Sequence, residues 1–147
     1  GVLYNWPAAL TACPEGWHLP SDAEWTQLEN YLIANGYNYD GSTEGNKIAK
    51  SMAANSGWTT SSYTGAVGNT DYPAYRNKSG FTALPGGYRR RNGNFSNIGI
   101  TGYWWSSTEN DTLNAWYRNL SYSTSLVNRY SHHKDYGFSV RCLRDSD

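Results

Sequence analysis

The clearest hydrophobic pattern lies near the N-terminus, where Trp25, Leu28 and Leu32 recur at the spacing of one helix face. Ser21 precedes this stripe, and a glutamate lies three residues after Ser21. This spacing is the signature of a helix capping box. An Asn-Gly pair comes after the stripe and favours the left-handed conformation that ends many helices. The pattern therefore predicts a helix over residues 21–34.

A weaker helical pattern follows, in which Ile48 and Met52 share one face. It predicts a second helix from residue 43 or 44 to residue 54. Residues 56–80 are rich in Gly, Ser, Thr, Asn and Tyr and show no sustained period, so they predict a long loop. Such a loop either carries function or is a structural excursion anchored by Trp58.

The second half of the chain favours strands. Runs typical of short strands of an antiparallel sheet occupy residues 81–84, 103–107, 115–120 and 137–142. In the last run Phe138, Val140 and Cys142 alternate with polar residues and are expected to face inward. Residues 88–95 predict a hairpin, because Asn92-Gly93 accepts the positive φ of a type I′ turn. Helices early and strands late indicate the α+β class.

Composition adds limits on class and partners. The 147 residues fit one domain, 1–147, and carry a formal net charge of zero, so no broad basic field favours nucleic acid. The sequence contains no run of 18 apolar residues, so membrane insertion is not expected. The chain starts without an initiator Met or signal peptide, so we expect a domain excised from a larger surface or virion protein. Aromatic residues make up 16% of the chain, which predicts a core of Trp and Tyr rings.

Two cysteines lie near opposite ends of the sequence, at Cys13 and Cys142. If they pair, the bridge closes a loop of about 130 residues and ties the termini together, which the chain-entropy estimate values at roughly 5 kcal/mol. The alternative is two unrelated buried thiols, as in a reducing cytosol. We expect the disulfide.

The segment between Tyr117 and Tyr136 has the composition of a recognition surface. Thirteen of its twenty residues are Tyr, Ser, Asn, His or Asp. Tyr offers stiff amphipathic contact area and Ser and Asn offer adaptable hydrogen bonds, as in antibody paratopes. The interleaved residues Arg118, Val127, Arg129, Lys134 and Phe138 are expected to form a constant frame. The predicted ligand contacts are Tyr117, Tyr122, Ser123, Ser125, Asn128, Tyr130, His132, His133 and Tyr136.

Other chemistry finds little support. Strand alternation would divide the three arginines 89–91 between two faces, so we expect a solvated hairpin edge and not an anion site. Adjacent His132 and His133 make a poor metal chelate, and we expect no metal or other cofactor. The cluster Glu109-Asn110-Asp111 offers oxygen atoms to calcium but lacks the companion motifs of a calcium-dependent lectin. No recognisable catalytic constellation occurs, so an enzyme is not expected.

Four ordered blocks resemble a known family. They are Cys13 to Trp25 (CPEGWHLPSDAEW), Gly80 to Tyr88 (GFTALPGGY), Gly102 to Glu109 (GYWWSSTE) and Gly137 to Asp145 (GFSVRCLRD). Together they resemble the Fibrobacter succinogenes major paralogous domain over nearly the whole chain. The resemblance implies a C-type-lectin-like fold of the type found in formylglycine-generating enzymes. It also implies an extracellular location, in secreted lipoproteins and other surface proteins of Bacteroidetes-type bacteria.

The same fold branch contains the variable proteins of diversity-generating retroelements, which mutate adenines in Asn codons. Tyr, Ser, His and Asp are each one such change from Asn, so the resemblance implies that residues 103–136 are a diversified receptor-binding surface. An ordinary polar sheet surface would share this composition. The oxidase chemistry of formylglycine-generating enzymes is not implied, because it needs reactive cysteines.

Three functional hypotheses therefore stand in order. The first is an extracellular binding or adhesion module for a protein or glycan ligand, for instance on a phage tail or a surface lipoprotein. The second is a structural or assembly module whose polar face keeps it soluble. The third is a carbohydrate-active enzyme.

Overall fold

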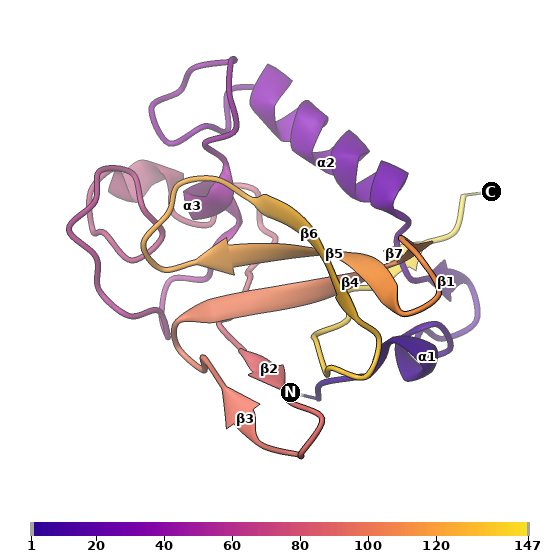
Figure 1. Cartoon of the computed structure of the whole chain (residues 1–147). Helices are drawn as coiled ribbons and strands as arrows, with labels where there is room; N and C mark the ends of the chain where they lie inside the picture. The colour runs from indigo at the N-terminus through magenta and orange to yellow at the C-terminus, as the bar shows by residue number, and fades with distance from the viewer. Residues whose placement is uncertain (1, 147) are drawn as a thin grey trace.

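The computed structural model describes residues 2–146 and places a three-stranded antiparallel sheet at the centre of the molecule (Figure 1). The sheet has the order β4 (Thr101–Glu109), β5 (Asn114–Ser121) and β6 (Asn128–His133). The shorter elements are α1 (Trp6–Ala9), β1 (Trp17–His18), α2 (Asp22–Ala34), α3 (Ala49–Met52), η1 (Pro73–Tyr75), β2 (Tyr88–Arg89), β3 (Phe95–Ser96) and β7 (Leu143–Arg144). The predicted α+β class is confirmed.

Helix α2 begins where the sequence predicts. The Ser21 hydroxyl accepts from the backbone N–H of Glu24 at 3.1 Å, and the Glu24 carboxylate accepts from the backbone N–H of Ser21 at 3.0 Å. Two otherwise unpaired N–H groups of the first turn are thereby satisfied. The helix lies along the sheet on the side opposite to the β2–β3 hairpin (Figure 1) and packs on β4 and β5. Trp25 and Leu32 enter the core there.

Strand β5 is buried on both faces because a core lies on each side of the sheet. Toward α2, Trp104 and Leu120 pack with the buried helix residues. On the other face Trp105 and Tyr117 pack with Phe138 of the C-terminal segment. The register pairs Trp105 of β4 with Tyr117 of β5, so these side chains share a face. Aromatic rings thus supply much of the core, as the composition predicts.

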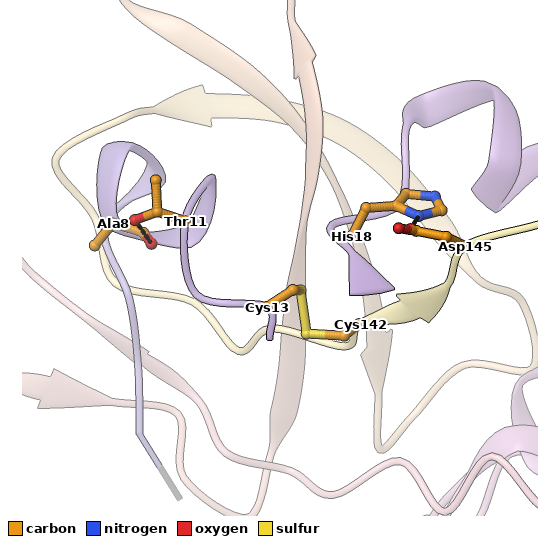
Figure 2. Close-up of a disulfide and its surroundings, with 6 residues drawn as sticks. All are labelled: Ala8, Thr11, Cys13, His18, Cys142 and Asp145. Atoms are coloured by element: carbon orange, nitrogen blue, oxygen red, sulfur yellow. Dashed lines mark hydrogen bonds and ion pairs between the residues drawn. A yellow bond between two sulfur atoms is a disulfide. The ribbon is translucent and has the colours of Figure 1, made fainter. Parts of the chain in front are cut away.

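The termini are tied together in three ways. Strand β1 pairs antiparallel with β7, and a disulfide joins Cys13 to Cys142 with a Cα–Cα distance of 5.7 Å. Figure 2 shows His18 beside this bridge with its ring directed at Asp145. Its Nδ1 lies 2.6 Å from the Asp145 carboxylate, and its Nε2 lies 2.9 Å from the carboxylate of Glu24. The predicted disulfide is confirmed, and His18 links the C-terminal segment to the start of α2.

The predicted second helix is wrong in length. Only α3, four residues long, is helical, and the chain before it curls around a side chain. The Asn38 amide donates to the carbonyls of Glu44 and Gly45 and accepts from the N–H of Lys47. These bonds hold backbone groups that a helix would need, and Gly45 has a φ of 76°.

Two strand predictions also need correction. Residues 81–84 form no strand but a single parallel bridge from Ala83 to Ala53, and Thr82 is left-handed because Asn77 binds its N–H and hydroxyl. The segment 137–142 lies in isolated bridges, and the paired strand β7 starts only at residue 143. Phe138 is nevertheless buried, as the alternation predicts.

The predicted hairpin forms, with a different turn. Strands β2 and β3 pair, but of Asn92 and Gly93 only the glycine has positive φ, at 88°. The carbonyl of Arg90 accepts from the N–H of Gly93 at 2.9 Å. The connection is therefore not a two-residue type I′ turn, and the strand ends at Arg89.

The long loop, residues 56–80, contains only the short helix η1, as predicted. It is anchored by Lys50 of α3, whose side chain is fully buried. The ammonium donates to the carbonyl of Asn69 at 2.8 Å and to the backbone and carboxylate of Asp71. Trp58 adds a hydrogen bond from its indole to the carbonyl of Ala83. Within residues 2–146 no helix is long and apolar enough to cross a membrane.

Candidate functional site

Strand register decides which predicted contact residues share a face. Tyr130 of β6 lies opposite Tyr117 of β5, Asn128 lies opposite Asn119, and His132 lies opposite Ala115. Because side chains alternate along a strand, these residues lie on the sheet face that carries Phe138. His133 points to the other face, where its ring lies 3.5 Å from Asp135.

An aromatic patch covers this face. We define it by six rings in mutual contact, namely Tyr88, Tyr103, Tyr117, Tyr130, His132 and Tyr136. Centroid distances along the patch run from 4.1 Å between His132 and Tyr136 to 6.3 Å between Tyr117 and His132. Phe138 touches Tyr103, Tyr117 and His132 and joins the patch to the core. Such offset and edge-to-face contacts stabilise each ring pair by about 0.5–1.5 kcal/mol.

Tyr117 corrects the predicted contact set. Only 7% of its surface is exposed, and burial raises the pKa of its hydroxyl to about 12. The ring forms the floor of the patch, and its burial leaves little of it open to a ligand, contrary to the exposed contact that the sequence predicts. The sequence pattern missed this because β5 lies between two other strands and beneath the C-terminal segment. Tyr130, by contrast, is 52% exposed, and His132 and Tyr136 are half-buried.

Two polar atoms on the patch face lack partners among the described residues. They are Nδ1 of His132 and Oδ1 of Asn119, both of which are buried. Burial also lowers the pKa of His132, so its imidazole is held in the neutral form at neutral pH. Most buried polar groups in proteins have a partner, and unsatisfied ones often mark functional positions.

Three of the predicted contacts lie elsewhere. Tyr122, Ser123 and Ser125 form the turn between β5 and β6 and are half-buried. Their backbone serves to join segments, since the carbonyl of Tyr122 accepts from Gly68 of the long loop and that of Ser125 accepts from Ala49 of α3. These residues lie beyond the Asn119 and Asn128 pair, at the end of the sheet away from His132. The predicted surface is therefore divided into two regions.

The sequence pattern missed contributions from the β2–β3 hairpin. Tyr88 stacks on Tyr136 at 5.8 Å and touches Tyr103 at 5.3 Å. The guanidinium of Arg90 lies 5.6 Å from the Tyr88 ring, and that of Arg91 lies 5.9 Å from the Tyr136 ring. The only available signal was the nearness of these arginines to a tyrosine in one short hairpin.

The opposite face of the sheet holds three of the five expected frame residues, Arg118, Val127 and Arg129, whereas Phe138 packs beneath the patch and Lys134 follows the end of β6. Arg118 is completely buried and pairs with Asp22 at 2.6 Å and with Glu29 at 2.8 Å, both on α2. Arg129 lies 3.7 Å from the ring of Trp116 and also pairs with Asp22. The hydrogen bond from Arg129, with help from Arg118, holds the pKa of Asp22 below its usual value. This face is occupied by intramolecular contacts, which fits a structural role.

The acidic cluster after β4 closes a turn. The carboxylate of Asp111 accepts from the backbone N–H groups of Leu113 and Asn114, and that of Glu109 pairs with Lys134 at 2.5 Å. Within residues 2–146 no group of three or more His, Cys, Asp or Glu gathers as a metal site.

Two hollows lie apart from the aromatic patch. A groove of about 500 Å³ is lined mainly by apolar side chains, among them Val2, Leu84 and Phe95. A smaller hollow of about 250 Å³ lies between α2 and the C-terminal segment, against Trp25 and Phe81. We place the candidate site on the patch because amphipathic rings, unsatisfied polar atoms and cations meet there.

Comparison with known proteins identifies the family of this chain. Neither a curated protein nor a solved structure matches it. The sequence model of the Fibrobacter succinogenes major domain matches residues 1–144, which include both cysteines and every strand of the central sheet. This chain therefore belongs to the Fibrobacter succinogenes major domain family.

Proposed function

We propose that this domain is an extracellular ligand-binding module and that the aromatic patch is its binding surface. The observation that carries the proposal is the continuous contact of six rings with polar edges on one sheet face, with Tyr130 more than half exposed. Tyr rings give large contact area with few rotatable bonds, and each hydroxyl adds a hydrogen bond. A protein or glycan ligand with flat faces and polar groups fits this chemistry.

The unsatisfied atoms support the same proposal. A bound hydroxyl can donate to Oδ1 of Asn119 and can pair with Nδ1 of His132, provided that the side chains turn slightly toward the surface. A buried polar group without a partner costs about 1–3 kcal/mol, so a ligand that supplies the partner recovers part of that cost. The domain without ligand therefore holds two polar atoms with which a polar ligand can form hydrogen bonds.

The fold and location complete the proposal. A C-type-lectin-like fold is supported by the pairing of β1 with β7, by the disulfide that joins the terminal segments, and by a late antiparallel sheet after an early helix. A disulfide between distant cysteines also favours an oxidising compartment such as a cell surface or virion. We propose a binding role in a surface lipoprotein or a phage receptor-binding protein, without enzymatic activity.

Retroelement diversification is a further element of the proposal. On β6 three residues of the Asn-codon set, Asn128, Tyr130 and His132, face the patch, and two more, Ser131 and His133, face the other way with Arg129, which Asp22 holds against α2. A mutating process limited to Asn codons would spare Arg129 and change positions on both faces, of which the first three contribute to the patch. A reverse-transcriptase gene beside this one, with an Asn-rich near-copy of residues 103–142, would support diversification, and its absence would count against it.

The test is ligand capture by patch variants. The wild-type domain is screened on a glycan array and on cells from the native habitat, and the captured ligand is titrated against Tyr130→Ala. We expect the variant to lose at least tenfold in affinity, since truncation of an aromatic binding hot spot costs about 2 kcal/mol or more. Tyr31→Ala on α2, a residue that is 60% exposed, is the matched control and should bind normally.

The outcomes separate the functional alternatives. Equal affinity of Tyr130→Ala and the wild type for the captured ligand would place the binding surface elsewhere. Failure of the wild-type domain to bind any glycan or cell surface above background would favour the structural or assembly module. Thermal unfolding of each variant shows that loss of binding is not loss of the fold.

A further inference from the structure

The hairpin turn brings two cations to the aromatic patch. Because β2 ends at Arg89, strand alternation does not separate the next two residues. The guanidinium groups of Arg90 and Arg91 lie within 6 Å of the rings of Tyr88 and Tyr136, which stack on each other. Cations over aromatic faces are attracted by the ring quadrupole and keep their polar edges directed to solvent.

Both arginines are available to a ligand. Arg90 is exposed and uses its Nε to donate to the Ser96 hydroxyl at 3.0 Å. Arg91 is more than half exposed and forms a long ion pair with the equally exposed Asp135, with 3.6 Å between nitrogen and oxygen and no hydrogen bond, so a ligand anion would compete with Asp135 for it. In residues 2–146 the terminal nitrogens of these two guanidiniums make no hydrogen bond to protein. Although the whole chain is neutral, this end of the patch carries a local excess of positive charge.

The ligand must therefore satisfy three demands at once. The exposed rings call for a flat face, and Oδ1 of Asn119 calls for a hydrogen-bond donor, which a carboxylate cannot supply. The guanidiniums of Arg90 and Arg91, one over each ring of the stacked Tyr88 and Tyr136 pair, call for an anionic ligand that accepts N–H bonds. A sugar that carries a carboxylate or sulfate brings C–H faces, hydroxyl donors and an anion in one unit.

We propose that the aromatic patch recognises an acidic glycan, with Arg90 and Arg91 binding its carboxylate or sulfate group. This inference rests on the proposed function and names the ligand class of the same surface. It assigns recognition roles to two hairpin residues that lie outside the segment 103–136. An acidic peptide shares the anionic chemistry but brings fewer hydroxyl groups to the unsatisfied amide and imidazole.

The experiment compares two sugars with the same backbone, one charged and one neutral. The domain is titrated calorimetrically with hexagalacturonate and with its fully methyl-esterified, neutral form. Exposed ion pairs contribute about two- to fivefold each in affinity, so we expect the acid to bind roughly tenfold more tightly than the ester. The double variant Arg90→Gln/Arg91→Gln should reduce the affinity for the acid to that for the ester and leave the ester unchanged.

A control and a salt series sharpen the result. Arg144→Gln removes an exposed arginine from β7 and should not change either affinity. Raising the salt concentration from 0.05 M to 0.5 M should weaken binding of the acid and leave binding of the ester unchanged, because salt screens the charged contact. Unfolding temperatures of all variants should agree within a few degrees, since the substituted side chains are exposed.

Contrary outcomes are distinct from those of the proposed function. Equal binding of acid and ester, both lost in Tyr130→Ala, would overturn the acidic-glycan inference and keep the patch as a binding surface. Binding of neither sugar at millimolar concentration would also overturn it. Tighter binding of hexaglutamate than of hexagalacturonate, lost in the arginine double variant, would replace the glycan by an acidic peptide.

Discussion

Replacement of Arg118 by Met tests the polar contact that joins helix α2 to the sheet. Its Nε donates to Glu29 at 2.8 Å, and its Nη1 donates to Asp22 at 2.6 Å. Methionine keeps much of the apolar stem and removes the charge. Asp22 retains the guanidinium of Arg129 at 2.8 Å, so Glu29 is the carboxylate left without a partner. Breaking a buried ion pair from one side costs about 3–5 kcal/mol of unfolding free energy.

The pH dependence of this loss has a definite sign. Burial already raises the pKa of Glu29 above its usual 4.5, even with Arg118 beside it. When the pKa of a carboxyl is higher in the folded state than in the unfolded state, protonation stabilises the fold. This stabilisation is complete below the pKa of the unfolded state and is lost as pH rises through the pKa of the folded state. Removal of Arg118 raises the folded pKa further, and each added unit costs about 1.4 kcal/mol once the group ionises. The deficit should be smallest near pH 4.5 and grow toward pH 7.5.

Urea denaturation at these two pH values measures the effect in four proteins: the wild type, Arg118→Met, Glu29→Gln and the double variant. We expect Glu29→Gln to recover part of the loss in the Arg118→Met background, because it removes the unpaired charge. Arg144→Met, an exposed substitution, serves as the control. A loss below 1 kcal/mol at pH 7.5, or a loss that does not vary with pH, would refute this reasoning.

Three further predictions concern the tied termini and the long loop. Substituting both Cys13 and Cys142 by Ser should lower the free energy of unfolding by about 2–5 kcal/mol, measured by urea titration against the wild type under non-reducing conditions; equal stability would show that the bridge contributes little. Hydrogen bonds to Asp145 and to the capping-box glutamate raise the pKa of His18, so its contribution is full below the unfolded pKa near 6.5 and is lost as pH rises through the folded pKa. The stability difference between wild type and His18→Asn should therefore be larger at pH 6 than at pH 9, and a constant difference would contradict this. Lys50→Met should free the long loop, so limited proteolysis should cut residues 56–80 at least tenfold faster than in the wild type, and unchanged cleavage would show that other contacts hold the loop.

Local signals in the sequence were the reliable ones. Helix α2 begins at a capping box whose two hydrogen bonds join residues only three apart, so the pattern contains the whole interaction. The second helix was predicted too long because the competing partner is distant from the pattern. The Asn38 side chain forms hydrogen bonds with backbone groups of residues 44–47, which lie six to nine positions later in the sequence. Periodicity contains no information about such a side chain.

The candidate site was predicted in part for the same reason. The sequence pattern predicts no strand over residues 128–133, so it misses β6, whose alternation places Tyr130 and His132 on one face, and it does not reveal strand order. Tyr117 carries the same signal and is buried because β5 is central and Phe138 covers it. The contribution of Arg90 depends on where β2 ends, which a turn decides. Composition thus predicts an aromatic and polar surface, and tertiary contacts decide which side chains form the patch.

The disulfide also determines how the domain responds to mechanical tension. A pull applied at the two ends of the described chain passes from residue 2 to Cys13, across the sulfur atoms, and out from Cys142. The loop between the cysteines, whose sequence separation is 129, lies outside this covalent path, so the central sheet cannot be extended while the bridge is intact. At about 3.3–3.6 Å for each extended residue, roughly 425–465 Å of chain is withheld from stretching. A module that holds a ligand under flow would keep its binding face folded at forces that extend its ends, and reduction of one bond would remove this protection.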